Sequence, residues 1–137
     1  MSPEAVFPMA KPRRKIMVVD DSEVVRETVR LALEEQGYEV VTRDGPFGFS
    51  RALLDERPDL VLLDVSMPKL RGDRLAEVAK RSGIPSCPIV LFSTSPEEEL
   101  KQMAANCGAA AYIPKTGNGE LLASEIERII AAHRRSG

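Results

Sequence analysis

The sequence has no tryptophan, a single histidine and two cysteines, and only 4% of its residues are aromatic. With His133 as the one imidazole, neither a metal centre built from His and Cys nor histidine-based catalysis is expected. Cys87 and Cys107 do not form a CxxC spacing. Two reduced, packed thiols in a cytoplasmic protein are the simpler interpretation.

Long apolar runs and an excess of one charge are also missing. No run approaches the roughly 18 apolar residues that a membrane span needs. At the N-terminus the basic residues follow the short apolar part, the reverse of a secretory signal. Lys and Arg number 19 against 21 Asp and Glu, which argues against nucleic-acid binding driven by phosphate neutralisation. The length of 137 residues suits one domain with one core.

From Lys15 onward, short apolar stretches alternate with amphipathic ones. "IMVVD" (16–20) is typical of a buried strand, whereas Val25, Val29 and Leu33 recur at helical spacing. The expected strands are 16–20, 38–42, 59–64, 88–93 and 110–114. The expected helices are 22–36, 45–57, 73–82, 95–108 and 118–133.

The fourth expected helix has the clearest start. Ser95 is a favoured N-cap residue, Pro96 suits the first helical position, and Glu98 completes a capping box.

Strands that are apolar throughout, separated by helices, indicate a parallel sheet covered on both faces. Right-handed crossovers then give a doubly wound, flavodoxin-like α/β fold with five strands in the order 2-1-3-4-5 and five helices. We expect residues 1–14 to form a flexible tail, 15–133 the domain, and 134–137 a tail or linker. A basic anchor for an anionic surface is the less favoured interpretation of residues 1–14.

Polar side chains come at the ends of four strands, and in parallel sheets ligands bind beyond those ends. These residues are Asp20, Asp21, Asp64, Ser93 and Lys115. Two carboxylates 4 Å apart repel by about 4 kcal/mol at an effective dielectric near 20, so a divalent cation such as Mg²⁺ is expected. An acid cluster, a metal, an ammonium and a hydroxyl are suited to phosphoryl transfer. Any one of these residues alone is more simply a helix cap.

The pattern resembles the receiver domain of bacterial two-component response regulators, in particular the single-domain chemotaxis type. The similarity extends from Lys15 to about Ala132. It rests on an acidic pair after the first strand, an acid within "DVSMP", a glycine eight residues later, a switch hydroxyl, a switch aromatic and a lysine. These features are Asp20-Asp21, Asp64, Gly72, Ser93, Tyr112 and Lys115.

The resemblance implies a phosphoacceptor rather than an enzyme, with at most Mg²⁺-dependent self-phosphorylation from small donors and autodephosphorylation. A sensor histidine kinase or a phosphotransfer protein would donate the phosphoryl group to Asp64. Mg²⁺ would be bound by Asp21, Asp64 and the backbone carbonyl of Ser66, with Asp20 acting largely through water.

The resemblance further implies that Lys115 and the Ser93 hydroxyl bind the acyl phosphate. Movement of Ser93 would open space for Tyr112, and so change the surface formed by the fourth helix, fifth strand and fifth helix. A downstream protein would bind that surface, and a homodimer is compatible with it. Ser66 and Ser95 stand where the family tunes the lifetime of the phosphate.

One departure from the family pattern concerns the residue after the lysine. Thr116 follows Lys115 where the family usually has a proline with a cis peptide bond, and Pro114 comes before it instead. Two alternatives remain. One, which this departure leaves open, is a receiver-fold scaffold that works without phosphorylation. The other is an aspartyl phosphatase, which the sequence disfavours because Ser22 stands where a D-x-D motif needs its second acid.

Overall fold

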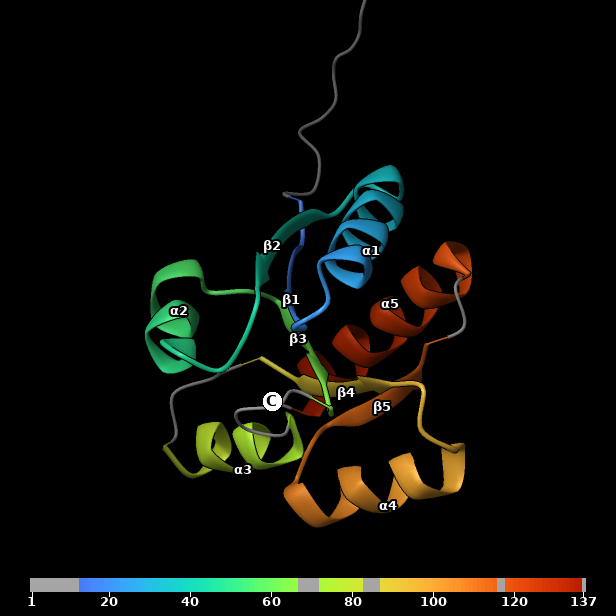
Figure 1. Cartoon of the computed structure of the whole chain (residues 1–137). Coiled ribbons are helices and arrows are strands. Elements are labelled where there is room, and N and C mark those ends of the chain that lie inside the picture. The colour runs from blue at the N-terminus through green and yellow to red at the C-terminus, as the bar shows by residue number, and fades with distance from the viewer. Residues whose placement is uncertain (1–12, 67–71, 83–86, 116–117, 137) are drawn as a thin grey trace, which may run out of the picture.

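The computed structural model describes residues 13–66, 72–82, 87–115 and 118–136. Strands and helices alternate along the chain, as the hydrophobic pattern predicts (Figure 1). The strands are β1 (Lys15–Val19), β2 (Glu39–Arg43), β3 (Leu60–Asp64), β4 (Ile89–Ser93) and β5 (Ala111–Pro114). The helices are α1 (Glu23–Glu35), α2 (Phe49–Glu56), α3 (Gly72–Ser82), α4 (Glu97–Cys107) and α5 (Gly119–Ser136).

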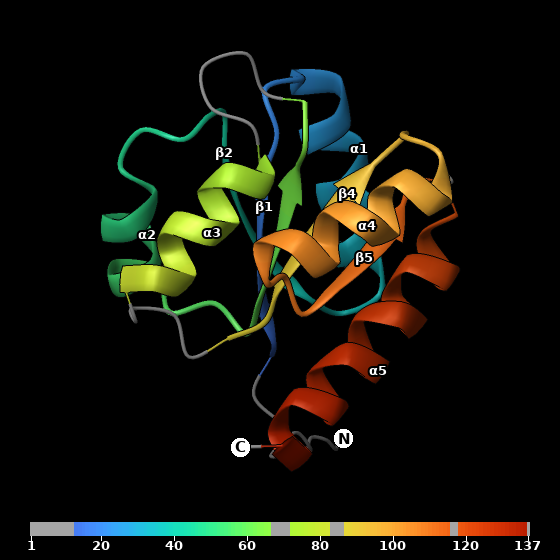
Figure 2. The same cartoon turned by 90° about the horizontal axis from the view of Figure 1, so that it is seen from below.

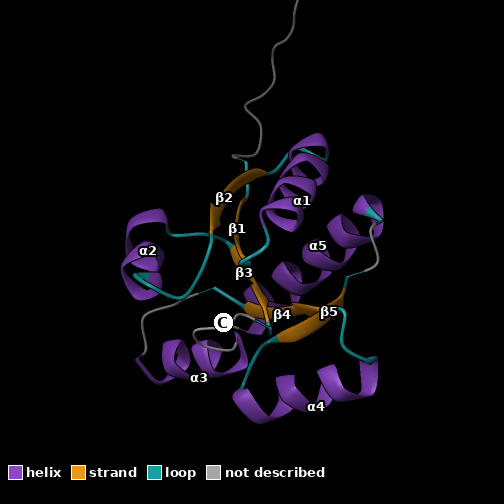
Figure 3. Ribbon diagram, viewed as in Figure 1, coloured by secondary structure: helices purple, strands orange, loops and turns teal. Residues whose placement is uncertain are grey.

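The five strands form one parallel sheet in the order β2-β1-β3-β4-β5, which confirms the predicted topology (Figure 3). Side chains of successive strand residues point to opposite faces. In β1, Ile16 and Val18 belong to the core beneath α1 and α5, whereas Met17 and Val19 belong to the core beneath α2, α3 and α4. The helices accordingly cover both faces of the sheet (Figures 1 and 2).

The helix starts differ in how well they follow from local sequence. Ser22 is the N-cap of α1, and its side chain accepts a hydrogen bond from the backbone N–H of Val25 at 3.2 Å. The predicted start of α4 is wrong by one position, since Pro96 occupies the N-cap and no side chain caps the helix. The hydroxyl of Ser95 is engaged elsewhere: it accepts a hydrogen bond from the hydroxyl of Ser93.

The chain is attached to the domain before β1 begins. The Arg14 Nε lies 3.1 Å from Glu127 Oε2 on α5, and the Arg14 carbonyl accepts a hydrogen bond from the Glu39 N–H. At the other end, α5 continues to Ser136, three residues beyond the expected end at 133. No helix in the described ranges is long and apolar enough to cross a membrane.

Candidate functional site

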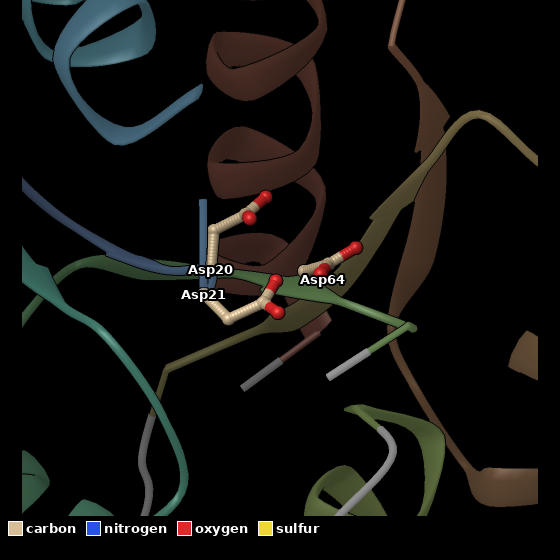
Figure 4. A group of neighbouring side chains, drawn as sticks. All are labelled: Asp20, Asp21 and Asp64. Atoms are coloured by element: carbon tan, nitrogen blue, oxygen red, sulfur yellow. The ribbon is translucent and has the colours of Figure 1, made fainter. Parts of the chain in front are cut away.

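Three carboxylates from two neighbouring strands meet at the carboxyl edge of the sheet. Asp20 and Asp21 follow β1, and Asp64 is the last residue of β3. One carboxylate oxygen from each lies within 4.8 Å of the others, and Figure 4 shows the three side chains close to one another where the two strands end. Asp20 and Asp64 are buried, whereas Asp21 is exposed. The structure therefore brings these three acids together, as the strand-end pattern predicts.

Lys115 is the cation of this cluster. Its Nζ lies 2.9 Å from Asp20 Oδ2 and 3.2 Å from Asp64 Oδ1, and its side chain is only 17% exposed. The backbone N–H of Lys115 donates to the Ser93 carbonyl at 2.9 Å, and the ammonium lies 5.5 Å from the centre of the Phe92 ring. These contacts fix the ammonium above β4, between the two buried acids.

The turn between β1 and α1 holds Asp20 in place. Asp20 Oδ1 accepts a hydrogen bond from the Ser22 N–H at 2.9 Å, and the Asp20 carbonyl accepts one from Arg26 Nη1 at 2.8 Å. The Asp20 N–H donates to the Arg43 carbonyl at 3.1 Å. The capping residue and Arg26 therefore help to position the cluster, a role that the strand-end pattern alone did not reveal.

Burial and charge perturb the titration of the two central groups. Burial raises the pKa of Asp64 above its ordinary value, and the neighbouring Asp20 adds to the rise, while Lys115 and the Ser66 N–H work against it. The pKa of Lys115 is also raised, because hydrogen bonds and attraction from Asp20 and Asp64 outweigh its own burial. At neutral pH the ammonium therefore stays charged, and the Asp64 carboxylate carries an energetic penalty.

The residues present suit a magnesium ion. Three carboxylates share one ammonium, so the cluster retains excess negative charge, and hard oxygen donors are the ligands that Mg²⁺ prefers. In the described part of the chain, no ion pair reaches the exposed carboxylate of Asp21, which is open to an incoming cation.

The remaining predicted site residues lie on β4, on β5, after β3 and at the start of α3. Ser93 is buried, and its hydroxyl donates to the Ser95 Oγ at 3.0 Å while accepting from the Ser95 N–H at 3.0 Å. Tyr112 packs partly against the core beneath α4, and its hydroxyl donates to Glu97 Oε2 at 3.1 Å. Ser66 lies two residues after the end of β3 and is exposed. Gly72 is the first residue of α3.

Two parts of the predicted pattern lie outside the described residues. One is the Met-Pro pair of "DVSMP", and the other is Thr116 with the peptide bond that joins it to Lys115.

The structure therefore belongs to the class of doubly wound parallel α/β domains that carry an acidic site beyond the carboxyl ends of their strands. A family profile described as the response regulator receiver domain matches residues 16–127. The chain belongs to this family. Receiver domains are phosphoacceptors rather than enzymes in the ordinary sense, and they generally bind Mg²⁺ at the acidic pocket.

Curated relatives are bacterial two-component transcriptional regulators. The phosphate regulon transcriptional regulatory protein PhoB of Pseudomonas aeruginosa is 31% identical over 125 residues, covering 90% of this chain and 53% of that protein. Transcriptional regulatory protein PdtaR of Mycobacterium tuberculosis is 33% identical over 128 residues, covering 91% and 60% respectively. The chain thus spans little more than half the length of these relatives.

Solved structures give the same assignment. Chemotaxis protein CheY4 of Vibrio cholerae superposes with a TM-score of 0.78 at 28% identity, covering 86% of this chain and 99% of that one. A CheY-like receiver domain from Methanospirillum hungatei superposes with a TM-score of 0.80 at 25% identity, covering 92% and 100%. The scaffold alternative is not favoured, because the acid cluster typical of the family is intact.

Proposed function

We propose that this receiver domain accepts a phosphoryl group on Asp64 from the phosphohistidine of a sensor kinase or a phosphotransfer protein. The observation that supports this most strongly is the position of Asp64: a buried carboxylate at a strand end, among two further acids and an ammonium. A helix-capping role would require none of these neighbours.

In the transfer, an oxygen of Asp64 attacks the phosphorus, an O–P bond forms, and the P–N bond to the donor imidazole breaks. The imidazole nitrogen keeps the electron pair of that bond. Lys115, already 3.2 Å from Asp64 Oδ1, orients the carboxylate and then offsets charge on the phosphoryl oxygens. Its second partner, Asp20, keeps the ammonium in place when Asp64 becomes an acyl phosphate.

Asp21, Asp64 and the Ser66 carbonyl would bind Mg²⁺, with Asp20 contributing largely through water. When bound, the ion neutralises charge that develops on the transferring group. The raised pKa of Asp64 supports the need for a cation, because the ionised carboxylate is poorly stabilised by the protein alone.

The phosphorylated site would act on the α4–β5–α5 surface through Ser93 and Tyr112. For its hydroxyl to donate to the acyl phosphate, Ser93 must give up the hydrogen bond that it donates to the Ser95 Oγ. Tyr112 must likewise leave Glu97 to turn inward. The free-energy difference between two such arrangements is small enough for one added dianion to reverse it. A downstream protein would then distinguish the two surfaces.

The test is labelling by acetyl phosphate, followed by intact mass. The wild-type chain gains one phosphoryl group only when Mg²⁺ is present, and Asp64→Asn gains none. Asp44→Asn, which removes an exposed acid after β2, is the matched control and labels normally. Labelling of Asp64→Asn, or equal labelling of the wild type in excess chelator, contradicts the proposal.

A further inference from the structure

The connection between β4 and α4 carries a complete helix-capping sequence that the structure does not use as a cap. In "SPEE" (95–98), Ser95 is a favoured N-cap residue, Pro96 suits the first helical position, and Glu98 stands where a capping box needs its acid. The helix starts one residue later: Pro96 is the N-cap, at φ −54° and ψ 143°, and no side chain caps α4. The Leu100 N–H bonds to the Pro96 carbonyl at 3.0 Å in the first turn. A start one residue earlier is therefore available to this helix.

Ser93 occupies both groups of Ser95 that a capping box uses. In a capping box, the N-cap hydroxyl oxygen accepts from the N–H of the third helical residue, and the carboxylate of that residue accepts from the N-cap N–H. Here the Ser95 Oγ accepts from the Ser93 hydroxyl at 3.0 Å, and the Ser95 N–H donates to the Ser93 Oγ at 3.0 Å. Ser93 and Glu98 therefore compete for the same two groups.

The backbone around Pro96 is prepared for the earlier start. The φ of Pro96 already has a helical value, so only its ψ has to turn from extended to helical. The residue before a proline prefers an extended backbone, which is the conformation of an N-cap residue. Three exposed acids, Glu97, Glu98 and Glu99, follow in the first turn, where the helix dipole stabilises carboxylates. Lengthening α4 by one residue thus requires rotation about one backbone bond.

The two arrangements of Ser95 have contributions of the same size. An N-cap side chain favours a helix start by about five-fold, and a neutral hydrogen bond contributes about two- to ten-fold net. Ser93 is buried, so its hydroxyl loses stabilisation if it leaves Ser95 with no other partner. An acyl phosphate on Asp64 would supply that partner, and the balance would then favour a capped α4.

We propose that Ser95 is a positioning residue with two alternative partners. It binds Ser93 in the unphosphorylated domain, and it caps α4 when the Ser93 hydroxyl turns to an acyl phosphate on Asp64. The capped helix begins at Pro96. The second step rests on the proposed function, whereas the competition between Ser93 and Glu98 does not.

The cap connects the phosphoacceptor edge with the α4–β5–α5 surface. The first turn of α4 includes Glu97, whose carboxylate accepts the Tyr112 hydroxyl at 3.1 Å. A rearrangement of this turn therefore reaches the hydrogen bond that holds Tyr112.

The competition is tested on the full chain without any phosphate, by NMR of amide exchange. Ser93→Ala removes the competitor, so the Glu98 amide bonds to Ser95 and exchanges about five-fold more slowly than in the wild type. Ser93→Ala/Ser95→Ala returns to the wild-type rate, whereas Ser93→Ala/Ser95→Thr keeps a capping hydroxyl and stays slow. The Val25 amide, which Ser22 caps through the same spacing, is the internal control and keeps its rate in every variant.

The coupling to the phosphoacceptor is tested with beryllofluoride and Mg²⁺, which stand in for the phosphoryl group. Their binding slows the Glu98 amide in the wild type and not in Ser95→Ala. A wild type that binds beryllofluoride without slower exchange at Glu98 overturns the coupling.

Other outcomes separate the two proposals. A wild-type rate at Glu98 in Ser93→Ala, or slow exchange that persists in Ser93→Ala/Ser95→Ala, overturns the competition. A chain that does not bind beryllofluoride contradicts the proposed function, and slow exchange in its Ser93→Ala variant still supports the competition for Ser95.

Discussion

Replacing Lys115 by Gln removes the only ammonium within 3.2 Å of the two buried acids in the described residues. At an effective dielectric near 20, attraction at 2.9 Å and at 3.2 Å amounts to about 5–6 kcal/mol for each pair. Most of this offsets the cost of removing three charges from water, and breaking such a buried arrangement typically costs about 3–5 kcal/mol. Because Lys115 keeps some exposure, we expect a loss of about 2–4 kcal/mol in the free energy of unfolding at pH 7.5.

The loss in the free energy of unfolding of Lys115→Gln must depend on pH and on Mg²⁺. In the variant, the Asp64 carboxylate has lost the ammonium that opposes its raised pKa, so it takes up a proton more readily and the difference from wild type shrinks at pH 5. A divalent cation substitutes for part of the missing charge, so Mg²⁺ shrinks the difference as well. Urea denaturation at the two pH values, in chelator and in excess Mg²⁺, measures all four cases. An equal loss under every condition would show that Lys115 contributes packing and not charge.

Three further predictions concern stability. Because burial raises the pKa of Asp64, ionisation of this carboxylate opposes folding, and stability falls as pH rises through that raised pKa. Asp64→Asn therefore raises the melting temperature at pH 7.5 in chelator. Mg²⁺ at ten times its dissociation constant stabilises only the wild type, by about 1.4 kcal/mol. A melting temperature of Asp64→Asn below that of the wild type in chelator refutes this. Ser22→Ala removes the side-chain cap of α1 and lowers the free energy of unfolding, measured by urea denaturation, by about 1 kcal/mol. No loss would mean that α1 starts without this cap. Leu33→Ala removes a fully buried side chain from the inner side of α1 and lowers the free energy of unfolding by about 2–5 kcal/mol in the same assay. A smaller loss would indicate that neighbouring side chains move into the cavity.

The sheet and the acid cluster could be predicted from sequence for one physical reason. Buried parallel strands are continuous apolar runs, and their last residues must lie at a common edge, so the sequence alone predicts that Asp20 and Asp64 lie close together. Which acids are buried could not be predicted. Asp20 and Asp21 are adjacent and identical in type, and only the turn into α1, fixed by Ser22 and Arg26, buries the first and exposes the second.

Hydrogen bonds between side chains that are close in sequence could not be predicted either. Ser95 has the residue type and the spacing of an N-cap, yet its hydroxyl and N–H both bond to Ser93, and Pro96 takes the cap position. An N-cap pattern in the sequence shows that a side chain can bond the first N–H groups of a helix. It does not show that a neighbouring hydroxyl will bind that side chain first. The hollow of about 350 Å³ lined by α1 and α5 could not be predicted either, because it depends on how the two helices pack and not on the pattern of either helix.

The central claim is that Asp64, and no other acid of the cluster, receives the phosphoryl group. Borohydride reduces an aspartyl phosphate to homoserine, which peptide mass spectrometry locates in the sequence. After treatment with acetyl phosphate and Mg²⁺, we expect homoserine at position 64 and aspartate at positions 20 and 21. Homoserine at position 20 or 21, or a labelled chain in which position 64 remains aspartate, would contradict it.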